Sequence, residues 1–208
     1  MRDRDGRGGV MEITPYILIG GRSERFGRDK ALFTISGESL AMLAVTAAET
    51  ALGGVAARFV AARVDQFPQL SQRETIGDMY PGRGAVGAVH AALSDAKTEW
   101  IFVLACDLPF VTAEFIGLLT SKLADNIDAV IPEDPAGRTQ PLCGFYHVAA
   151  CREVFGYAAK GSGKTPSLLA LIDSLRSRVL SFNEYKMLSG AERILQNVNT
   201  RDDLAGIE

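Results

Sequence analysis

The chain has 208 residues, a formal net charge of −3 and 47% hydrophobic residues. These values are typical of one globular domain with a full core, and the lack of an overall basic charge excludes broad nonspecific binding to nucleic acid. The apolar runs fall short of the roughly 20 residues that a membrane helix needs, so no membrane span is expected.

The first residues differ in composition from the rest of the chain. The segment MRDRDGRGGV carries five charges and three glycines and has almost no apolar side chains to bury. Residues 1–12 are therefore predicted to form a flexible tail, and residues 13–208 to form a single domain.

Beyond the tail, short apolar runs alternate with segments of helical periodicity, which is the pattern of βαβ units in a largely parallel sheet. Predicted strands are Tyr16–Ile19, Ala57–Ala61, Trp100–Cys106, Asp128–Ile131, Gln140–Val148 and Arg178–Phe182. Predicted helices are Ser39–Ala51, Gly84–Ser94, Thr112–Asp125, Val148–Ala159, Pro166–Arg176 and a short one from Thr200. The strand after Pro132 need not continue the parallel order. The fold class is thus α/β, Rossmann-like and three-layered, with a mixed, mainly parallel sheet.

A glycine pair follows the first predicted strand. Gly20 and Gly21 can bring backbone N–H groups close to an anion, because glycine has no Cβ in the way. Positive charges come soon after, at Arg22, Arg25, Arg28 and Lys30. A polyphosphate would suit this loop, although any single arginine is as well explained by solvent exposure. The spacing of the glycines does not match G-x-G-x-x-G, which argues against a Rossmann dinucleotide site.

A second lysine-rich segment only superficially resembles a phosphate loop. Lys160-Gly-Ser-Gly-Lys-Thr165 would complete G-x-x-x-x-G-K-[ST] only with glycine at position 158, where the chain has alanine. The segment also follows a predicted helix instead of a strand. It is expected to be a loop between helices, with its lysines available to a second substrate.

An aspartate ends the most hydrophobic strand. Trp100–Cys106 has the continuous apolar sequence of a central buried strand, and Asp107 follows it at the edge where open α/β sheets bind ligands. Mg²⁺ takes one or two carboxylates together with phosphate oxygens and water, so Asp107 could serve as its ligand. A turn or helix cap is the alternative explanation of Asp-Leu-Pro.

Together these segments resemble the molybdenum cofactor guanylyltransferases of the nucleotidyltransferase superfamily. Leu18-Ile-Gly-Gly-Arg-Ser-Glu-Arg-Phe-Gly-Arg-Asp-Lys30 is similar to the family's Leu-Ala-Gly-Gly-x-Ser-x-Arg-Met-Gly-x-Asp-Lys. Cys106-Asp-Leu-Pro-Phe110 resembles its metal motif, and Asn197-Val-Asn-Thr200 its C-terminal segment. Asp78 and the segment from Gly84 are similar to the family's Asp followed by Gly-Pro-Leu-x-Gly, with Ala85-Val86 in place of Pro-Leu. In the first motif the departures are Ile19 for Ala and Phe26 for Met. Phe59–Arg63 also lacks the Asn that some relatives carry after the second strand.

The resemblance implies transfer of GMP from GTP to molybdenum-bound molybdopterin, with release of pyrophosphate. It implies Arg25, Lys30 and Asp107 as catalytic residues and Asp107 as a Mg²⁺ ligand. It also implies that Asn199, with Asn197 as the alternative, lies near the metal and the phosphates. The implied nucleotide-binding residues are Leu18, Ile19, Gly20, Gly21, Arg25, Lys30, Asp78, Gly84 and Asp107.

The same resemblance, with the cysteines, suggests where the protein works. The three cysteines lack metal-ligand spacing, and no signal peptide is seen, so a cytoplasmic location is predicted. Expected partners are GTP, the molybdenum cofactor and proteins that receive the finished cofactor, with no nucleic acid or membrane. Two alternatives stay open: a cytidylyl- or other nucleotidyltransferase with a different acceptor, and a nucleotide-binding regulator without catalysis.

Overall fold

A computed structural model describes residues 11–20, 30–199 and 203 of the chain. Its main sheet has the strand order β5-β4-β1-β6-β8-β7-β9, and β8 runs antiparallel to both of its neighbours while the other pairings are parallel. The strands are β1 Ile13–Leu18, β4 Arg58–Ala61, β5 Thr75–Gly77, β6 Trp100–Ala105, β7 Ala129–Pro132, β8 Cys143–His147 and β9 Ser177–Leu180. The prediction of a mixed, mainly parallel sheet is confirmed.

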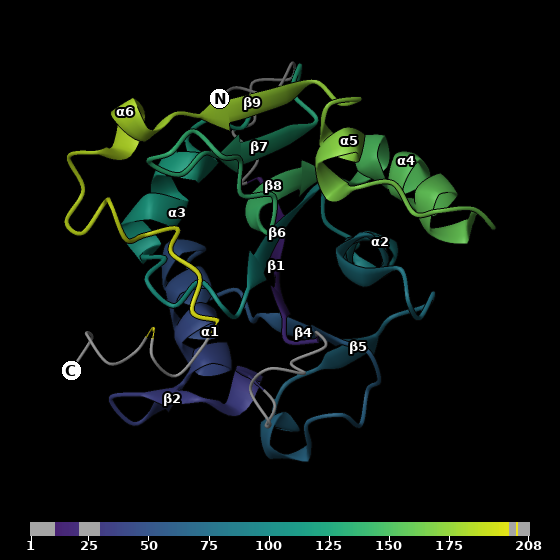
Figure 1. Ribbon diagram of the computed structural model, residues 1–208, viewed down its shortest axis with the longest axis horizontal. Helices are drawn as coiled ribbons and strands as arrows, with labels where there is room; N and C mark the ends of the chain where they lie inside the picture. Colours follow the sequence, from purple (N-terminus) through teal and green to yellow (C-terminus); the bar gives the residue numbers. More distant parts are fainter. Residues whose placement is uncertain (1–10, 21–29, 200–202, 204–208) are drawn as a thin grey trace.

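Helices cover both faces of this sheet (Figure 1). The first face carries α1 (Leu40–Ala51), α3 (Ala113–Thr120) and the short α6 (Phe182–Tyr185), which share one hydrophobic core. The second face carries α2 (Gly84–Asp95), α4 (Val148–Lys160) and α5 (Leu168–Ile172), which share a second core. Smaller elements are η1 (Lys30–Leu32), the hairpin of β2 (Thr34–Ile35) and β3 (Glu38–Ser39), and η2 (Pro68–Leu70). The result is the expected three-layer α/β arrangement.

Strand β6 shows why the central sequence is continuously apolar. All six of its residues are buried. Alternate side chains point to opposite faces of the sheet, so Phe102 and Leu104 join the core under α1 and α3. Ile101 and Val103 join the core under α2 and α4. A strand with helices on both faces needs apolar residues at every position.

Side-chain hydroxyls bind the backbone at both ends of α3. Thr112 Oγ1 accepts the N–H of Phe115 and caps α3, as its sequence position predicts. The same helix ends at Thr120 instead of Asp125, where the hydroxyls of Thr120 and Ser121 donate to backbone carbonyls of the last turn. Such bonds compete with continuation of the helix.

Other element limits also differ from the sequence predictions. The predicted helix Pro166–Arg176 is limited to α5, and the predicted strand Gln140–Val148 begins only at Cys143. Strand β5 and the β2–β3 hairpin were not predicted, because elements of two or three residues are too short for a clear alternation. Thr200 and residues 1–10 lie outside the described residues, so the C-terminal helix and the tail stay predictions. None of the helices in the described part has the length and apolar character to span a bilayer.

A network of polar contacts fixes α6 and with it the C-terminal segment. The hydroxyl of the buried Tyr185 donates to Glu133 O over 2.7 Å. Glu184 lies within 2.5 Å of Arg178 and 3.3 Å of Lys122. These contacts attach α6 to the end of β7, to β9 and to the end of α3, and so fix the point from which the C-terminal segment starts.

The capping box of α6 should make stability depend on acid pH. Partial burial opposes ionisation of Glu184, but the Ser181 N–H and the neighbouring cations Arg178 and Lys122 outweigh it and lower the pKa from 4.5 to about 2. Because the folded-state pKa is depressed, the contribution is complete above about pH 4.5 and is lost as the pH falls toward 2. Chemical denaturation across this range should show a smaller loss of unfolding free energy in Glu184→Gln than in wild type. Equal pH slopes would contradict this role of Glu184.

Strand β8 should not tolerate a side chain at Gly144. An added Cβ would lie 2.8 Å from Val130 O and 2.6 Å from Ile131 Cδ1. Gly144→Ala should therefore lower the unfolding free energy by about 1–3 kcal/mol, as overpacking does. Gly117→Ala on α3 is the control, because a Cβ there meets nothing within 4 Å and should stabilise by about 0.4–1 kcal/mol. Urea denaturation of both variants measures the difference.

Candidate functional site

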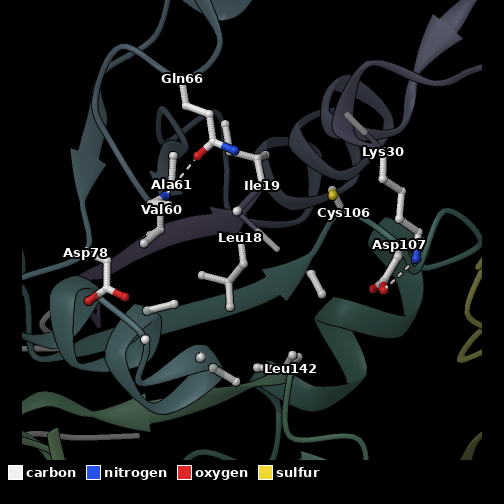
Figure 2. Close-up of a pocket in the computed structure, with 17 residues that line it drawn as sticks. Leu18, Ile19, Lys30, Val60, Ala61, Gln66, Asp78, Cys106, Asp107 and Leu142 are labelled. Atoms are coloured by element: carbon white, nitrogen blue, oxygen red, sulfur yellow. Dashed lines mark hydrogen bonds and ion pairs between the residues drawn. The ribbon is translucent and has the colours of Figure 1, made fainter. Parts of the chain in front are cut away.

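A cavity of about 670 Å³ opens at the carboxyl ends of the central strands (Figure 2). The ends of β1, β4 and β6, the residue after β5 and the start of α2 contribute its walls. The chain passes from β1 to β4 on one side and later to β6 on the other, so the cavity lies at a topological switch point, where open α/β sheets bind ligands. The lining residues from the sequence prediction are Leu18, Ile19, Gly20, Lys30, Asp78, Gly84 and Asp107.

The end of β1 approaches β4 too closely for a side chain at Gly20. The N–H groups of Ile19 and Gly20 both donate to Val60 O, over 2.9 and 3.2 Å. A Cβ on Gly20 would lie 2.9 Å from Ala62 N, in contact with backbone that cannot move aside. This close approach is the structural reason for the first glycine of the loop. Gly21 and Arg25 lie outside the described residues, so their phosphate contacts stay predictions.

Lys30, a predicted phosphate ligand, lines one end of the cavity. Its Nζ donates to Asp107 Oδ2 and to Asn199 Oδ1, each over 2.9 Å. The Lys30 side chain is only 14% exposed, and that of Asp107 is 29% exposed. Three predicted residues from separate parts of the sequence are therefore in direct contact.

Backbone bonds bring the C-terminal segment to this point. Val198 is buried, and its N–H donates to Asp107 O over 2.9 Å. The next residue, Asn199, has its N–H bound by the carboxylate of Asp203 over 2.7 Å. The backbone around Asn199 is thus held by two hydrogen bonds, while its side-chain oxygen accepts from Lys30.

Cys106 lines the same cavity but has no nucleophilic character. Burial, reinforced by the charge of Asp107, raises the pKa of the Cys106 thiol to about 12. The thiol is protonated at neutral pH, and a protonated thiol is a poor nucleophile. The chemistry of the site must come from its charged groups.

Asp78 lies against the first turn of α2, at the opposite end of the cavity from Lys30 (Figure 2). Its Oδ1 accepts the N–H of Tyr80 over 2.8 Å. A Cβ on Gly87 would lie 2.8 Å from Oδ1 and 2.9 Å from Oδ2, so only glycine leaves room for the carboxylate. Gly84, with φ +57°, starts α2 in a conformation that favours glycine. The sequence motifs predicted a role for Gly84 but not for Gly87, which belongs to no phosphate-loop pattern.

Arg83 connects the start of α2 to the lysine-rich loop. Its guanidinium donates to Gly161 O, to Gly163 O over 2.9 Å and to Thr165 Oγ1 over 3.0 Å. The loop thus faces Arg83 with carbonyl oxygens, whereas a phosphate loop faces its ligand with N–H groups. Residues 160–165 do not line the cavity. The exclusion of a P-loop from the sequence agrees with this geometry.

The described residues supply part of a divalent-metal site. They contain no group of three or more His, Cys, Asp and Glu side chains placed to bind a metal. Asp107 and Asn199 nevertheless present two oxygens to the same lysine nitrogen. One carboxylate and one amide oxygen fit Mg²⁺ when phosphate oxygens and water complete its shell. The donor set fits a metal that arrives with a phosphorylated ligand.

A cavity lined by charged side chains at the carboxyl ends of the central strands is typical of a ligand-binding α/β domain. Residues 16–178 match the model of the MobA-like NTP transferase domain. The chain therefore belongs to the MobA-like NTP transferase family. The sequence resemblance is thereby confirmed at the level of the family.

Individual relatives extend the similarity over nearly the whole chain. A probable molybdenum cofactor guanylyltransferase of Geobacillus sp. (strain WCH70) is 31% identical over 145 residues, which cover 69% of this chain and 74% of that protein. A protein of the same name from Bacillus velezensis is 28% identical over 197 residues, 93% of each chain. The crystal structure of molybdopterin-guanine dinucleotide biosynthesis protein A from Archaeoglobus fulgidus has a TM-score of 0.74 at 24% identity and covers 94% of this chain and 96% of that one. This structural likeness confirms the fold.

A methyl group at position 87 should disturb nucleotide binding through Asp78. Gly87→Ala would place its Cβ within 2.8 Å of the Asp78 carboxylate and push it from its position. Nucleotide dissociation constants should rise about tenfold, the size of one disrupted hydrogen-bonding group in a closed site. Titration calorimetry with GTP measures the change. Gly117→Ala serves as the control, and equal affinity in both variants would show that Asp78 does not bind the nucleotide.

Proposed function

We propose that this chain transfers GMP from GTP to the terminal phosphate of molybdenum-bound molybdopterin and releases pyrophosphate. The observation that carries the proposal is the contact of Lys30 with Asp107 and Asn199 at one end of a nucleotide-sized cavity. The names of the relatives, molybdenum cofactor guanylyltransferase, supply the substrate. Membership of the NTP transferase family supplies the reaction class.

Lys30 and Arg25 would hold the β- and γ-phosphates of GTP as the pyrophosphate leaves. Asp107 and Asn199 restrict the ammonium of Lys30 to one position before substrate arrives. A charge fixed in advance does not have to reorganise as negative charge develops on the leaving group, and this lowers the barrier. The attacking phosphate is already ionised, so no general base is required.

The carboxylate of Asp107 and the amide oxygen of Asn199 would hold Mg²⁺ in this site. When bound, the metal would neutralise the α-phosphate and favour attack on it. Leu18, Ile19, Gly20 and Gly21 would contact the nucleoside and phosphates, with Asp78 and Gly84 at the far end of the cavity. Burial of Ile19, which is 4% exposed, indicates that the departure from alanine is accommodated by packing on the α1 side of the sheet.

The proposed substrates also indicate the binding partners and the cellular compartment that we expect. GTP and the molybdenum cofactor are the proposed partners, followed by proteins that receive the finished dinucleotide cofactor. We place the reaction in the cytoplasm, without nucleic acid or membrane as a partner.

The two alternatives are not favoured. A cytidylyl- or other nucleotidyltransferase would not account for relatives of 26–31% identity that carry the guanylyltransferase name. A regulator without catalysis would have no reason to keep Lys30 and Asp107 in direct contact beside the cavity.

Pyrophosphate release from GTP, CTP, ATP and UTP, with Mg²⁺ and molybdenum-loaded molybdopterin, tests the proposal. GTP should be the preferred substrate, and Asp107→Asn should lower kcat by about a hundredfold or more because one fixed charge at the reacting phosphates is lost. Asp173→Asn, an exposed carboxylate at the end of α5, is the matched control and should keep full activity. Turnover with CTP but not GTP would refute the guanylyl assignment. GTP binding without turnover in wild type would favour the regulator.

A further inference from the structure

We infer that Gln66 determines base specificity by donating a hydrogen bond to the C6 carbonyl of guanine. The assignment rests on the proposed function, since it names a residue that recognises its nucleotide. Gln66 lies in the turn after β4 and lines the cavity. No glycine-loop or metal motif of the sequence includes it.

The turn around Gln66 is fixed by both backbone and core. The N–H of Gln66 donates to Arg63 O over 3.2 Å. The next residue, Phe67, is 6% exposed and belongs to the core under α1. The base of the Gln66 side chain therefore has a defined position at the rim of the cavity.

The orientation of the carboxamide is also fixed. Gln66 Oε1 accepts the N–H of Ala62 over 3.1 Å. Only the oxygen of a carboxamide can accept, so the NH₂ group must be on the other side. Figure 2 shows this nitrogen turned toward the side of Ile19. The NH₂ donors of Gln66 are therefore available to a ligand on that side of the cavity.

Asp78 presents the complementary chemistry at the same end of the cavity. Figure 2 shows Gln66 and Asp78 on either side of Val60 and Ala61, away from Lys30 and Asp107. With phosphates at the lysine end, the base of a nucleotide would reach the end that carries a donor and a carboxylate.

Guanine is the base whose edge suits this pair. It has a carbonyl acceptor at C6 next to two donors, N1–H and the 2-amino group. The Gln66 NH₂ would donate to the carbonyl, and the Asp78 carboxylate would accept from the two adjacent N–H groups. Adenine has an amine at C6 and no N1–H, so both contacts would be lost. A site built for hydrogen bonding strongly disfavours a ligand that leaves its groups unpaired.

The variant Gln66→Glu separates base recognition from turn stability. A glutamate can still accept the N–H of Ala62 and keep the turn, but it replaces the NH₂ donors with a second acceptor. The affinity for GTP should fall about ten- to hundredfold more than the affinity for ATP, because the acceptor repels a carbonyl but not an amine. Titration calorimetry with GTP and ATP measures this ratio without any acceptor substrate.

Two further variants make the result decisive. Gln69→Glu adds the same charge to an exposed position in the same turn and should leave the GTP to ATP ratio unchanged. Gln66→Met removes the donors without adding a charge and should reduce the ratio by about tenfold, which also covers the case of a poorly folded Gln66→Glu. An unchanged ratio in folded Gln66→Glu or Gln66→Met would overturn the assignment. So would a wild type with equal affinity for both nucleotides.

Transfer and recognition can fail independently. Selective GTP binding through Gln66, without transfer of GMP to molybdopterin, would refute the proposed reaction and leave the role of Gln66 intact. Transfer of GMP with no effect of either Gln66 variant on selectivity would support the proposed reaction and refute the role of Gln66.

Discussion

The ammonium group of Lys30 joins parts of the chain that lie 77 and 169 residues apart in the sequence, at Asp107 and Asn199. Each contact depends on a separate piece of the fold. Asp107 requires β6 to be in register with β1, and Asn199 requires the C-terminal segment to bind Asp107 through the Val198 N–H. The charged end of the cavity is therefore complete only when both ends of the domain have folded. Loss of the hydrogen bond from Val198 to Asp107 O would therefore disturb the contacts of Lys30 beside the cavity.

At the end of the cavity away from Lys30, two glycines allow neighbouring segments to approach closely. Gly20 is packed against the end of β4, at the same Ala62 whose N–H holds the Gln66 carboxamide. Gly87 performs a similar task for Asp78, by leaving room for its carboxylate beside α2. In both places the missing side chain makes space for a polar group next to the cavity. Small residues thus determine where the donors and acceptors of the site can lie.

Sequence patterns predicted the parts of this molecule that have strong periodicity or a motif. The run of apolar residues predicted β6, and the Asp after it lies in the wall of the cavity at the carboxyl ends of the strands. The sequence could not show that Lys30 contacts Asp107, because no local rule relates residues so far apart. Nor could it single out Gln66 or Leu142, which line the cavity from a turn and from the approach to β8 without any motif. The residues that end β4 and follow it up to Arg63 include no asparagine, as the sequence shows. The turn after them nevertheless supplies a carboxamide at Gln66, three residues beyond Arg63.

The antiparallel direction of β8 separates the connection between β7 and β8 from the parallel strands that lead to the cavity. Because β8 is antiparallel, its beginning, and not its end, meets the cavity edge, where Leu142 lies and where Leu142 O binds the N–H of Ala105. The chain reaches this point from β7 through a short turn held by the buried Asp134, with no crossing helix. A change in the connection that moves Leu142 would alter one wall of the cavity, while β5 and β6, which lead to Asp78 and Asp107, keep their register. The connection between β7 and β8 can therefore change in length without a change in the strands that precede Asp78 and Asp107.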